Sequence, residues 1–151
     1  MRILMVCLGN ICRSPLAEGI MQSKIDNNKL NWEVASAGTG SYHVGNAPDP
    51  RSIQVALENN IDLSQQRAQQ FKSSDFGYYD HIFVMDSSNF QNVSKLATNN
   101  EDKEKVVLIM NMIEPQRNVN VPDPYWGEHG FEKVYEMLDE ATDEILARYK
   151  N

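Results

Sequence analysis

Four short segments of the chain have the residue pattern of β-strands. In three of them every position is apolar, which is typical of strands buried on both faces of a parallel sheet. The other segment, WEVAS, mixes aromatic, β-branched and polar residues. We predict strands at residues 3–6, 32–36, 82–85 and 106–110.

Apolar residues recur between these segments at the spacing of amphipathic helices. We expect Ser14 to cap the first helix, with Pro15 in its first turn, and Asp49 to cap a second that begins at Pro50. Asp86 is expected to cap a third. The predicted helices cover residues 15–25, 50–59, 87–96 and 131–149. Strands that alternate with helices predict an α/β fold around a parallel sheet, in one domain of residues 1–151.

Composition and charge narrow the class of protein. The chain has 151 residues, of which 41% are hydrophobic and 23% charged, as in ordinary globular proteins. Its net charge of -7 argues against a nucleic-acid-binding protein, although one concave site can still be locally positive. No apolar run is long enough for a signal peptide or a membrane span. We therefore expect no membrane partner. Two cysteines in a chain of this length make no disulfide framework, so we expect a protein of the reducing cytoplasm.

The turn after the first predicted strand, in VCLGNICRSP, carries the strongest chemical pattern. In parallel α/β sheets, ligands bind outside the carboxyl ends of the strands, where this turn lies. Its backbone amides and the following helix N-terminus can form an anion site, and Arg13 adds a planar fork for two phosphate oxygens. This field would stabilise Cys7 as a thiolate that attacks phosphorus. A lone cysteine is more often a small buried residue, but CLGNICRS between a strand and a helix favours the nucleophile.

A thiolate brings no proton for the leaving group, so a separate acid is required. Two Asp-Pro pairs are candidates. Asp49 is explained by the helix that it precedes, whereas Asp123 lies in VPDPYWGEHG, where Tyr125 and Trp126 can flank an aryl ring. We therefore expect Asp123 to act as general acid and then as general base. The alternative is a plain turn aspartate, the commoner role of Asp-Pro.

These motifs together resemble the low-molecular-weight protein tyrosine phosphatases. The resemblance rests on CLGNICRSP, SAGTGSYHVGNAPDPRS, VMDSSN and DPYWG, and it spans essentially the whole chain. It implies a flavodoxin-like three-layer sandwich with a four-stranded parallel sheet, and hydrolysis through phosphocysteine without a metal or cofactor. By motif position, Cys7 is the nucleophile, Arg13 the phosphate clamp and Asp123 the acid.

The resemblance also assigns supporting residues around residues 7–13, which form the phosphate loop of this family. Asn10, Ser14 and Ser36 match a hydrogen-bond network, in which Ser14 would donate to the thiolate. Cys12 would close a reversible disulfide with Cys7 that shields it from irreversible oxidation, and a packing role for Cys12 is equally open. The phosphate and the substrate would be bound by the following residues: Leu8, Gly9, Asn10, Ile11, Cys12, Ser14, Tyr42, Tyr125 and Trp126.

Some positions depart from the family pattern. Many relatives have Trp at Tyr42, on the cleft wall, where Tyr42 would still stack on an aromatic ring but with a different pocket preference. Relatives often carry His at Gln65 and Arg at Gln69, and the loss of that His puts part of the supporting network in doubt. Trp126 replaces the second tyrosine of the DPYY form, which makes regulation by double tyrosine phosphorylation less plausible. The three histidines have no partner spacing and are expected to be solvated or in loops: His43, His81 and His129.

Two other functions use similar motifs. An arsenate reductase on the same scaffold needs a downstream pair of cysteines, and residues 13–151 contain none. A phosphate-binding or phospho-carrier module would receive the phosphoryl group on Cys7 without needing a general acid. The segment VPDPYWGEHG, residues 121–130, which we call the acid loop, carries Asp123 and therefore favours the phosphatase. The expected partners are a phosphotyrosine protein as substrate and inorganic phosphate as product, with the enzyme a monomer or weak dimer.

Overall fold

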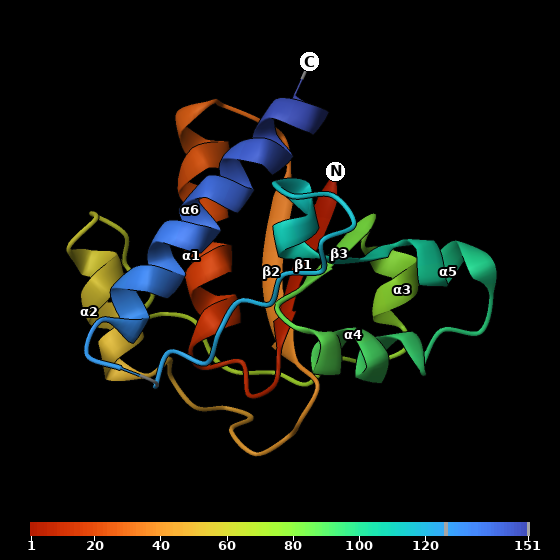
Figure 1. Ribbon diagram of the computed structural model, residues 1–151, viewed down its shortest axis with the longest axis horizontal. Helices are drawn as coiled ribbons and strands as arrows, with labels where there is room; N and C mark the ends of the chain where they lie inside the picture. Colours follow the sequence, from red (N-terminus) through yellow and green to blue (C-terminus); the bar gives the residue numbers. More distant parts are fainter. Residues whose placement is uncertain (126, 151) are drawn as a thin grey trace.

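The computed structural model describes residues 1–125 and 127–150. Within them, four parallel strands form a sheet in the order β2-β1-β3-β4 (Figure 1). Their bounds are β1 (Arg2–Cys7), β2 (Glu33–Gly38), β3 (His81–Val84) and β4 (Val106–Leu108). The order reverses direction between β1 and β3, and in such sheets this switch point is where the ligand site forms.

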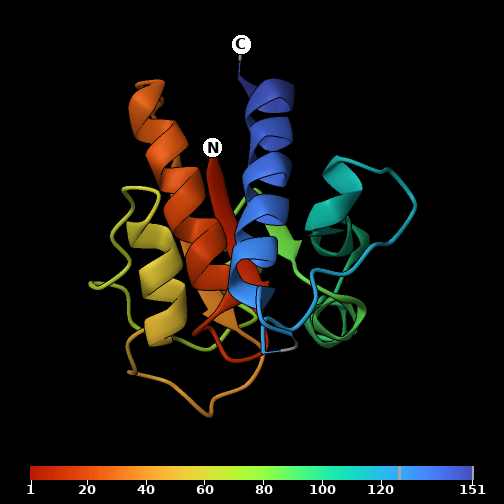
Figure 2. The same ribbon diagram turned by 60° about the vertical axis from the view of Figure 1, so that its left-hand side comes forward.

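Helices cover both faces of the sheet (Figures 1 and 2). One side carries α1 (Arg13–Asn27), α2 (Pro50–Leu57) and α6 (Gly130–Tyr149). The other carries α3 (Asp75–Tyr78), α4 (Ser87–Ser94) and α5 (Asn100–Glu104), and a short 3-10 helix η1 (Ile109–Met112) follows β4. The expected flavodoxin-like three-layer α/β fold is therefore confirmed.

The central strand explains the two cores. Ile3 and Met5 pack in the cluster that includes α1 and α6, whereas Leu4 and Val6 pack in the cluster on the opposite face. All four side chains are almost fully buried, because successive residues of a strand point to opposite faces and both faces are covered. This explains why the segment has no polar position.

The predicted elements are found with shifted ends. The fourth predicted strand is too long, because Ile109 and Met110 form η1. Asp49 accepts a hydrogen bond from the Arg51 N–H as the cap of α2, and Asp86 forms a capping box at α4, as predicted. The short helices α3 and α5 were not expected, since four or five residues give no helical period.

The expected cap at Ser14 is wrong. Helix α1 begins at Arg13, Cys12 occupies the N-cap position, and no side chain caps this end. The Ser14 hydroxyl lies 3.0 Å from Cys7 Sγ instead. The Ser14 hydroxyl therefore contacts the last residue of β1 rather than the helix backbone, and the uncapped helix end leaves its N–H groups available to an anion.

Helices α1 and α6 lie side by side (Figure 2). The Lys24 ammonium on α1 contacts the Asp139 and Asp143 carboxylates on α6 at 2.9 and 2.8 Å. The N-terminus and the C-terminal end of α6 lie at the end of the sheet opposite the loop after β1 (Figure 1). Of the helices formed by residues 1–125 and 127–150, none has the length and apolar character needed to cross a membrane.

Candidate active site

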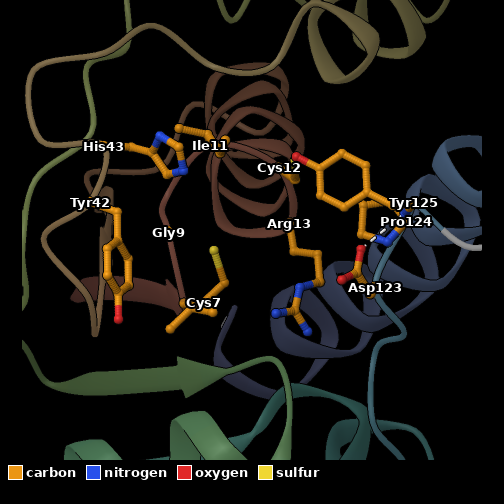
Figure 3. Close-up of a pocket in the computed structure, with 11 residues that line it drawn as sticks. Cys7, Gly9, Ile11, Cys12, Arg13, Tyr42, His43, Asp123, Pro124 and Tyr125 are labelled. Atoms are coloured by element: carbon orange, nitrogen blue, oxygen red, sulfur yellow. Dashed lines mark hydrogen bonds between the residues drawn. The ribbon is translucent and has the colours of Figure 1, made fainter.

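A pocket of about 130 Å³ opens beyond the carboxyl end of β1 (Figure 3). Tyr42 and His43 line one side, and Asp123 and Tyr125 line the other. The loop from β1 to α1 runs between these walls. The lining residues are Cys7, Leu8, Gly9, Ile11, Cys12, Arg13, Tyr42, His43, Asp123, Pro124 and Tyr125.

Cys7 ends β1 at the floor of this pocket. Its side chain is only 3% exposed, and its Sγ points into the space between the two walls (Figure 3). The Asn10 N–H donates to Cys7 Sγ at 3.3 Å, and Ser14 Oγ lies 3.0 Å away. Ser14 Oγ accepts a hydrogen bond from Asn10 Nδ2, and its proton can reach either the Cys7 sulfur at 3.0 Å or the Ala37 carbonyl at 3.5 Å. A thiolate only accepts, so with Cys7 ionised the hydroxyl would donate to sulfur. These two donors suit a negatively charged sulfur.

Asn10 holds the loop in shape. Its backbone has φ 57°, in the left-handed region that asparagine tolerates better than most residues. Its buried side chain donates to Ser14 Oγ at 2.8 Å and to Ser36 Oγ at 2.9 Å, and it accepts from the Gln69 N–H at 3.0 Å. The structure thus brings the three expected network residues together, with Gln69 added through its backbone.

The network extends to Glu18, which the sequence analysis did not single out. Ser36 Oγ donates to Glu18 Oε1 at 2.6 Å, and Gln69 Nε2 donates to the Ser36 carbonyl at 2.9 Å. Burial raises the pKa of Glu18 above its ordinary value of 4.5, although the hydrogen bond from Ser36 opposes this rise. Glu18 follows Ser14 by four residues in α1, so the helical spacing that puts both on one face was the available signal.

Arg13 is oriented by two groups from other parts of the chain. Its Nη1 donates to Asp86 Oδ2 at 2.7 Å and to the Val121 carbonyl at 3.0 Å. Asp86 was predicted only as a helix cap, but it has both roles, since its Oδ1 accepts from the Asn89 N–H. The Arg13 guanidinium lies beside the pocket near Cys7 and Asp123 (Figure 3).

Asp123 and Tyr125 form the opposite wall. The Asp123 carboxylate is exposed, and its Oδ1 accepts a hydrogen bond from the Tyr125 N–H at 3.0 Å. The Tyr125 hydroxyl donates to Asp49 Oδ2 at 3.2 Å and lies 3.1 Å from Cys12 Sγ. Gly130, the first residue of α6, lets the Pro124 carbonyl approach the helix closely, because a Cβ at Gly130 would lie 2.0 Å from that carbonyl oxygen.

Asp49 is poorly suited to donate a proton. Both of its carboxylate oxygens accept hydrogen bonds from the Arg51 side chain, at 3.1 and 3.0 Å. Partial burial raises its pKa, but the hydrogen bonds and the charge of Arg51 outweigh this and hold the pKa below its ordinary value. The structure thus holds Asp49 as an ion-paired cap of α2.

The two thiols differ in their surroundings. Both are free, and Cys12 is turned toward Tyr125. Because the Tyr125 hydroxyl donates to Asp49, the Cys12 S–H is the donor to the Tyr125 oxygen. Burial raises the pKa of Cys12 to about 11, which keeps it a neutral thiol. A packing role and a disulfide with Cys7 both stay open for Cys12.

The remaining predicted residues are two side chains of the pocket wall, the three histidines and Trp126. Tyr42 is 78% exposed on the pocket wall, and Leu8 beside it is also exposed. His43 lies in a turn, as expected, yet it lines the pocket, which its sequence context did not indicate. The expectation for His81 is wrong, because this residue begins β3, is half-buried and packs against Tyr149 of α6 at a ring-centroid distance of 4.5 Å. His129 is exposed in a turn, as expected. Trp126 lies outside the described residues, which include no group of three His, Cys, Asp or Glu side chains that could hold a metal ion.

The whole chain matches one family. A family model described as low molecular weight phosphotyrosine protein phosphatase matches residues 2–151. The chain belongs to this family. The low molecular weight phosphotyrosine protein phosphatase of Schizosaccharomyces pombe is 38% identical over 149 residues, with 96% of this chain and 94% of that protein covered. The human protein of the same name is 34% identical over 138 residues, with 89% and 87% covered.

Solved structures agree with this assignment. A protein tyrosine phosphatase from Entamoeba histolytica superposes with a TM-score of 0.90 at 34% identity, covering 98% of this chain and 96% of that one. DARP, a Drosophila arginine phosphatase, superposes with a TM-score of 0.91 at 31% identity, covering 100% and 99%. As a member of the family, this phosphatase is a hydrolase whose substrates are phosphoproteins and whose product is phosphate.

Proposed function

We propose that the phosphatase hydrolyses phosphotyrosine through a phosphocysteine on Cys7, with Arg13 as phosphate clamp and Asp123 as general acid and base. One observation carries the proposal: Cys7 Sγ, within hydrogen-bond distance of the Asn10 N–H and the Ser14 hydroxyl, lies at the floor of a pocket that Arg13 and Asp123 also line. A nucleophile, a cation for the phosphoryl oxygens and a carboxyl group for the leaving oxygen are the parts that this chemistry requires.

In the first step, the Cys7 thiolate attacks phosphorus and an S–P bond forms as the P–O bond to the aryl group breaks. The Asp123 carboxyl group gives its proton to the departing phenolate oxygen. The Arg13 contacts with Asp86 and Val121 use Nη1, and its Nε and Nη2 form a pair of donors that fits two equatorial oxygens. The loop N–H groups at the start of α1 stabilise the same charge.

In the second step, the Asp123 carboxylate takes a proton from water, and the water oxygen attacks phosphorus. The S–P bond breaks, the electron pair returns to Cys7, and inorganic phosphate is the product. The hydroxyl group of Ser14, 3.0 Å from the sulfur, stabilises the thiolate as it leaves. The enzyme then regains its starting protonation state.

The walls of the pocket favour an aryl phosphate. Tyr42 and Tyr125 stand on opposite sides of the opening, where they can stack on the ring of a phosphotyrosine. A phosphoserine is too short to carry its phosphate past these rims to Cys7. Because one structural relative is named as an arginine phosphatase, peptides carrying phosphotyrosine, phosphoserine and phosphoarginine should be compared, and we expect the first to give the highest kcat/KM.

Turnover separates this proposal from the phospho-carrier. The wild-type enzyme should release many equivalents of p-nitrophenol per Cys7, while Cys7→Ser, a matched change of one atom, should release none. A carrier would give a single burst of product and then stop. A steady rate in Cys7→Ser would exclude Cys7 as the nucleophile.

A further inference from the structure

The Arg51 side chain lies over the ring of Tyr125 in the acid loop and is not among the residues that line the pocket. It occupies the second position of α2, and its side chain is 59% exposed. The centre of its guanidinium lies 4.6 Å from the ring centroid of Tyr125 and 4.8 Å from that of Phe131. These two rings meet edge to face at 5.8 Å. The three groups thus contact one another, and the Tyr125 ring packs against both the Arg51 cation and an aromatic side chain from α6.

Arg51 also reaches the hydroxyl end of Tyr125 through Asp49. Its Nη2 donates to Asp49 Oδ2 at 3.0 Å and its Nε donates to Oδ1 at 3.1 Å. The same Oδ2 accepts the hydroxyl proton of Tyr125. Arg51 therefore fixes Tyr125 at two points, directly at the ring and indirectly at the oxygen.

Hydrogen bonds also connect the start of α2 to the phosphate loop. The Asp49 N–H donates to the Ile11 carbonyl at 2.8 Å, and Ser52 Oγ donates to the Cys12 carbonyl at 3.4 Å, so the start of α2 is joined to the phosphate loop. The backbone N–H of Tyr125 holds the Asp123 carboxylate. A continuous path runs from the phosphate loop through Arg51 and Tyr125 to Asp123.

We propose that Arg51 is a positioning residue that acts through Tyr125 to hold the Asp123 carboxyl group over the leaving oxygen. The proposal rests on the proposed role of Asp123 as general acid. The Arg51 end of the ion pair is exposed, and the Asp49 carboxylate, whose side chain is 10% exposed, keeps hydrogen bonds from the Arg51 N–H and the Tyr125 hydroxyl when the Arg51 side chain is removed. Removing that side chain should therefore loosen the acid loop rather than unfold the protein. A displacement of about 1 Å at a catalytic group is enough to slow catalysis strongly.

The test is the dependence of kcat/KM on the leaving group. For a series of aryl phosphates, kcat/KM reports the step that forms phosphocysteine, in which the acid protonates the departing oxygen. That proton matters more as the pKa of the free phenol rises. We expect Arg51→Ala to lower kcat/KM for phenyl phosphate by about 10-fold, a fraction of the 10²–10⁴-fold that a general acid contributes, with a smaller loss for more acidic phenols.

Three variants control the experiment. Arg148→Ala removes an exposed arginine near the far end of α6 and should match wild type at every leaving group. Asp123→Ala gives the slope expected when the acid is absent. Arg51→Lys keeps the charge but not the planar fork, so it should recover part of the activity.

The outcomes are distinct. An Arg51→Ala slope between those of wild type and Asp123→Ala, with an unchanged unfolding midpoint, supports the proposal. An equal loss for all leaving groups that disappears at high salt would overturn it, because Arg51 would then only attract the anionic substrate. No loss at all would also overturn it. If Asp123→Ala has the wild-type slope, the proposed acid itself is wrong, whatever Arg51 does.

Discussion

The Asp86 carboxylate accepts a hydrogen bond of 2.7 Å from Arg13 Nη1, although 73 residues separate them in the chain. Asp86 comes from the end of β3 and Arg13 from the start of α1, so neighbouring strands of the sheet bring them together. The ion pair is mostly buried, with side-chain exposures of 11% for Arg13 and 21% for Asp86. Asp86 therefore both caps α4 and directs the proposed phosphate clamp.

Replacing Asp86 should separate these two roles. Asp86→Ala removes a helix cap, worth about 1 kcal/mol of the free energy of unfolding, and also frees the Arg13 guanidinium. Asn99→Ala removes only a cap, at α5, where the Asn99 side chain accepts from the Asp102 N–H. We expect the inhibition constant for inorganic phosphate to rise about 10-fold in Asp86→Ala, because a charge-assisted hydrogen bond is lost. Equal inhibition constants in the two variants would mean that Asp86 is only a cap.

Asn10→Ala should destabilise the fold as well as the site. The left-handed backbone costs alanine about 1 kcal/mol, and the buried groups left without Asn10 add about 1–3 kcal/mol. Asn60→Ala is the control, since Asn60 has φ 63° at an exposed position and should show only the backbone cost. Urea unfolding measures both. A similar loss in the two variants would show that the hydrogen-bond network contributes nothing to stability.

Gly130→Ala should displace the acid loop. A Cβ there would lie 2.0 Å from the Pro124 carbonyl oxygen, whereas a Cβ at Gly77 of α3 meets nothing within 4 Å. We expect kcat/KM on phenyl phosphate to fall by at least about 10-fold in Gly130→Ala, through misplacement of Asp123. Gly77→Ala should keep the wild-type rate. An unchanged rate in Gly130→Ala would mean that the position of this loop does not limit catalysis.

The raised pKa of Glu18 predicts that the free energy of unfolding depends on pH. Its pKa in the folded protein is raised, mainly by burial, so the folded state holds its proton more tightly than the unfolded chain does. The free energy of unfolding therefore falls as pH rises from the unfolded pKa through the folded pKa. Glu18→Gln keeps an acceptor for Ser36 but removes this titration.

The stability of Glu18→Gln relative to wild type should therefore increase between pH 4 and pH 7.5 in urea titrations. Glu144→Gln, which removes a carboxylate from an exposed position of α6, serves as the control and should show no such increase. A constant difference between Glu18→Gln and wild type across this range would show that Glu18 titrates alike in both states.

Much of the fold was predictable because its signals are local. The fully apolar run at residues 3–6 identified the central strand, and the caps at Asp49 and Asp86 marked two helix starts. Local signals gave wrong predictions where contacts with distant residues determined the structure. Ser14 has the residue type of a cap, but its hydroxyl is drawn to Cys7, and the apolar run at residues 106–110 turns into η1 after Leu108.

The candidate site was predictable only as far as it lies in short motifs. Cys7, Arg13 and Asp123 belong to motifs that the sequence displays, and the structure gathers them around one pocket. Glu18 belongs to no such motif, and Arg51 lies in SAGTGSYHVGNAPDPRS without any sign of its role. The contacts of both depend on how α1 and α2 pack against distant loops. Long-range packing of this kind has no local pattern to read.

In the proposed mechanism the phosphoryl group passes through Cys7, and trapping the phosphoenzyme shows whether it does. Asp123→Ala, mixed with a reactive aryl phosphate and quenched in acid within milliseconds, should carry one added phosphoryl group by mass spectrometry, on the peptide that contains Cys7. Cys7→Ser, treated alike, should carry none. Phosphate on another residue, or steady hydrolysis without any phosphoenzyme under these conditions, would contradict the account.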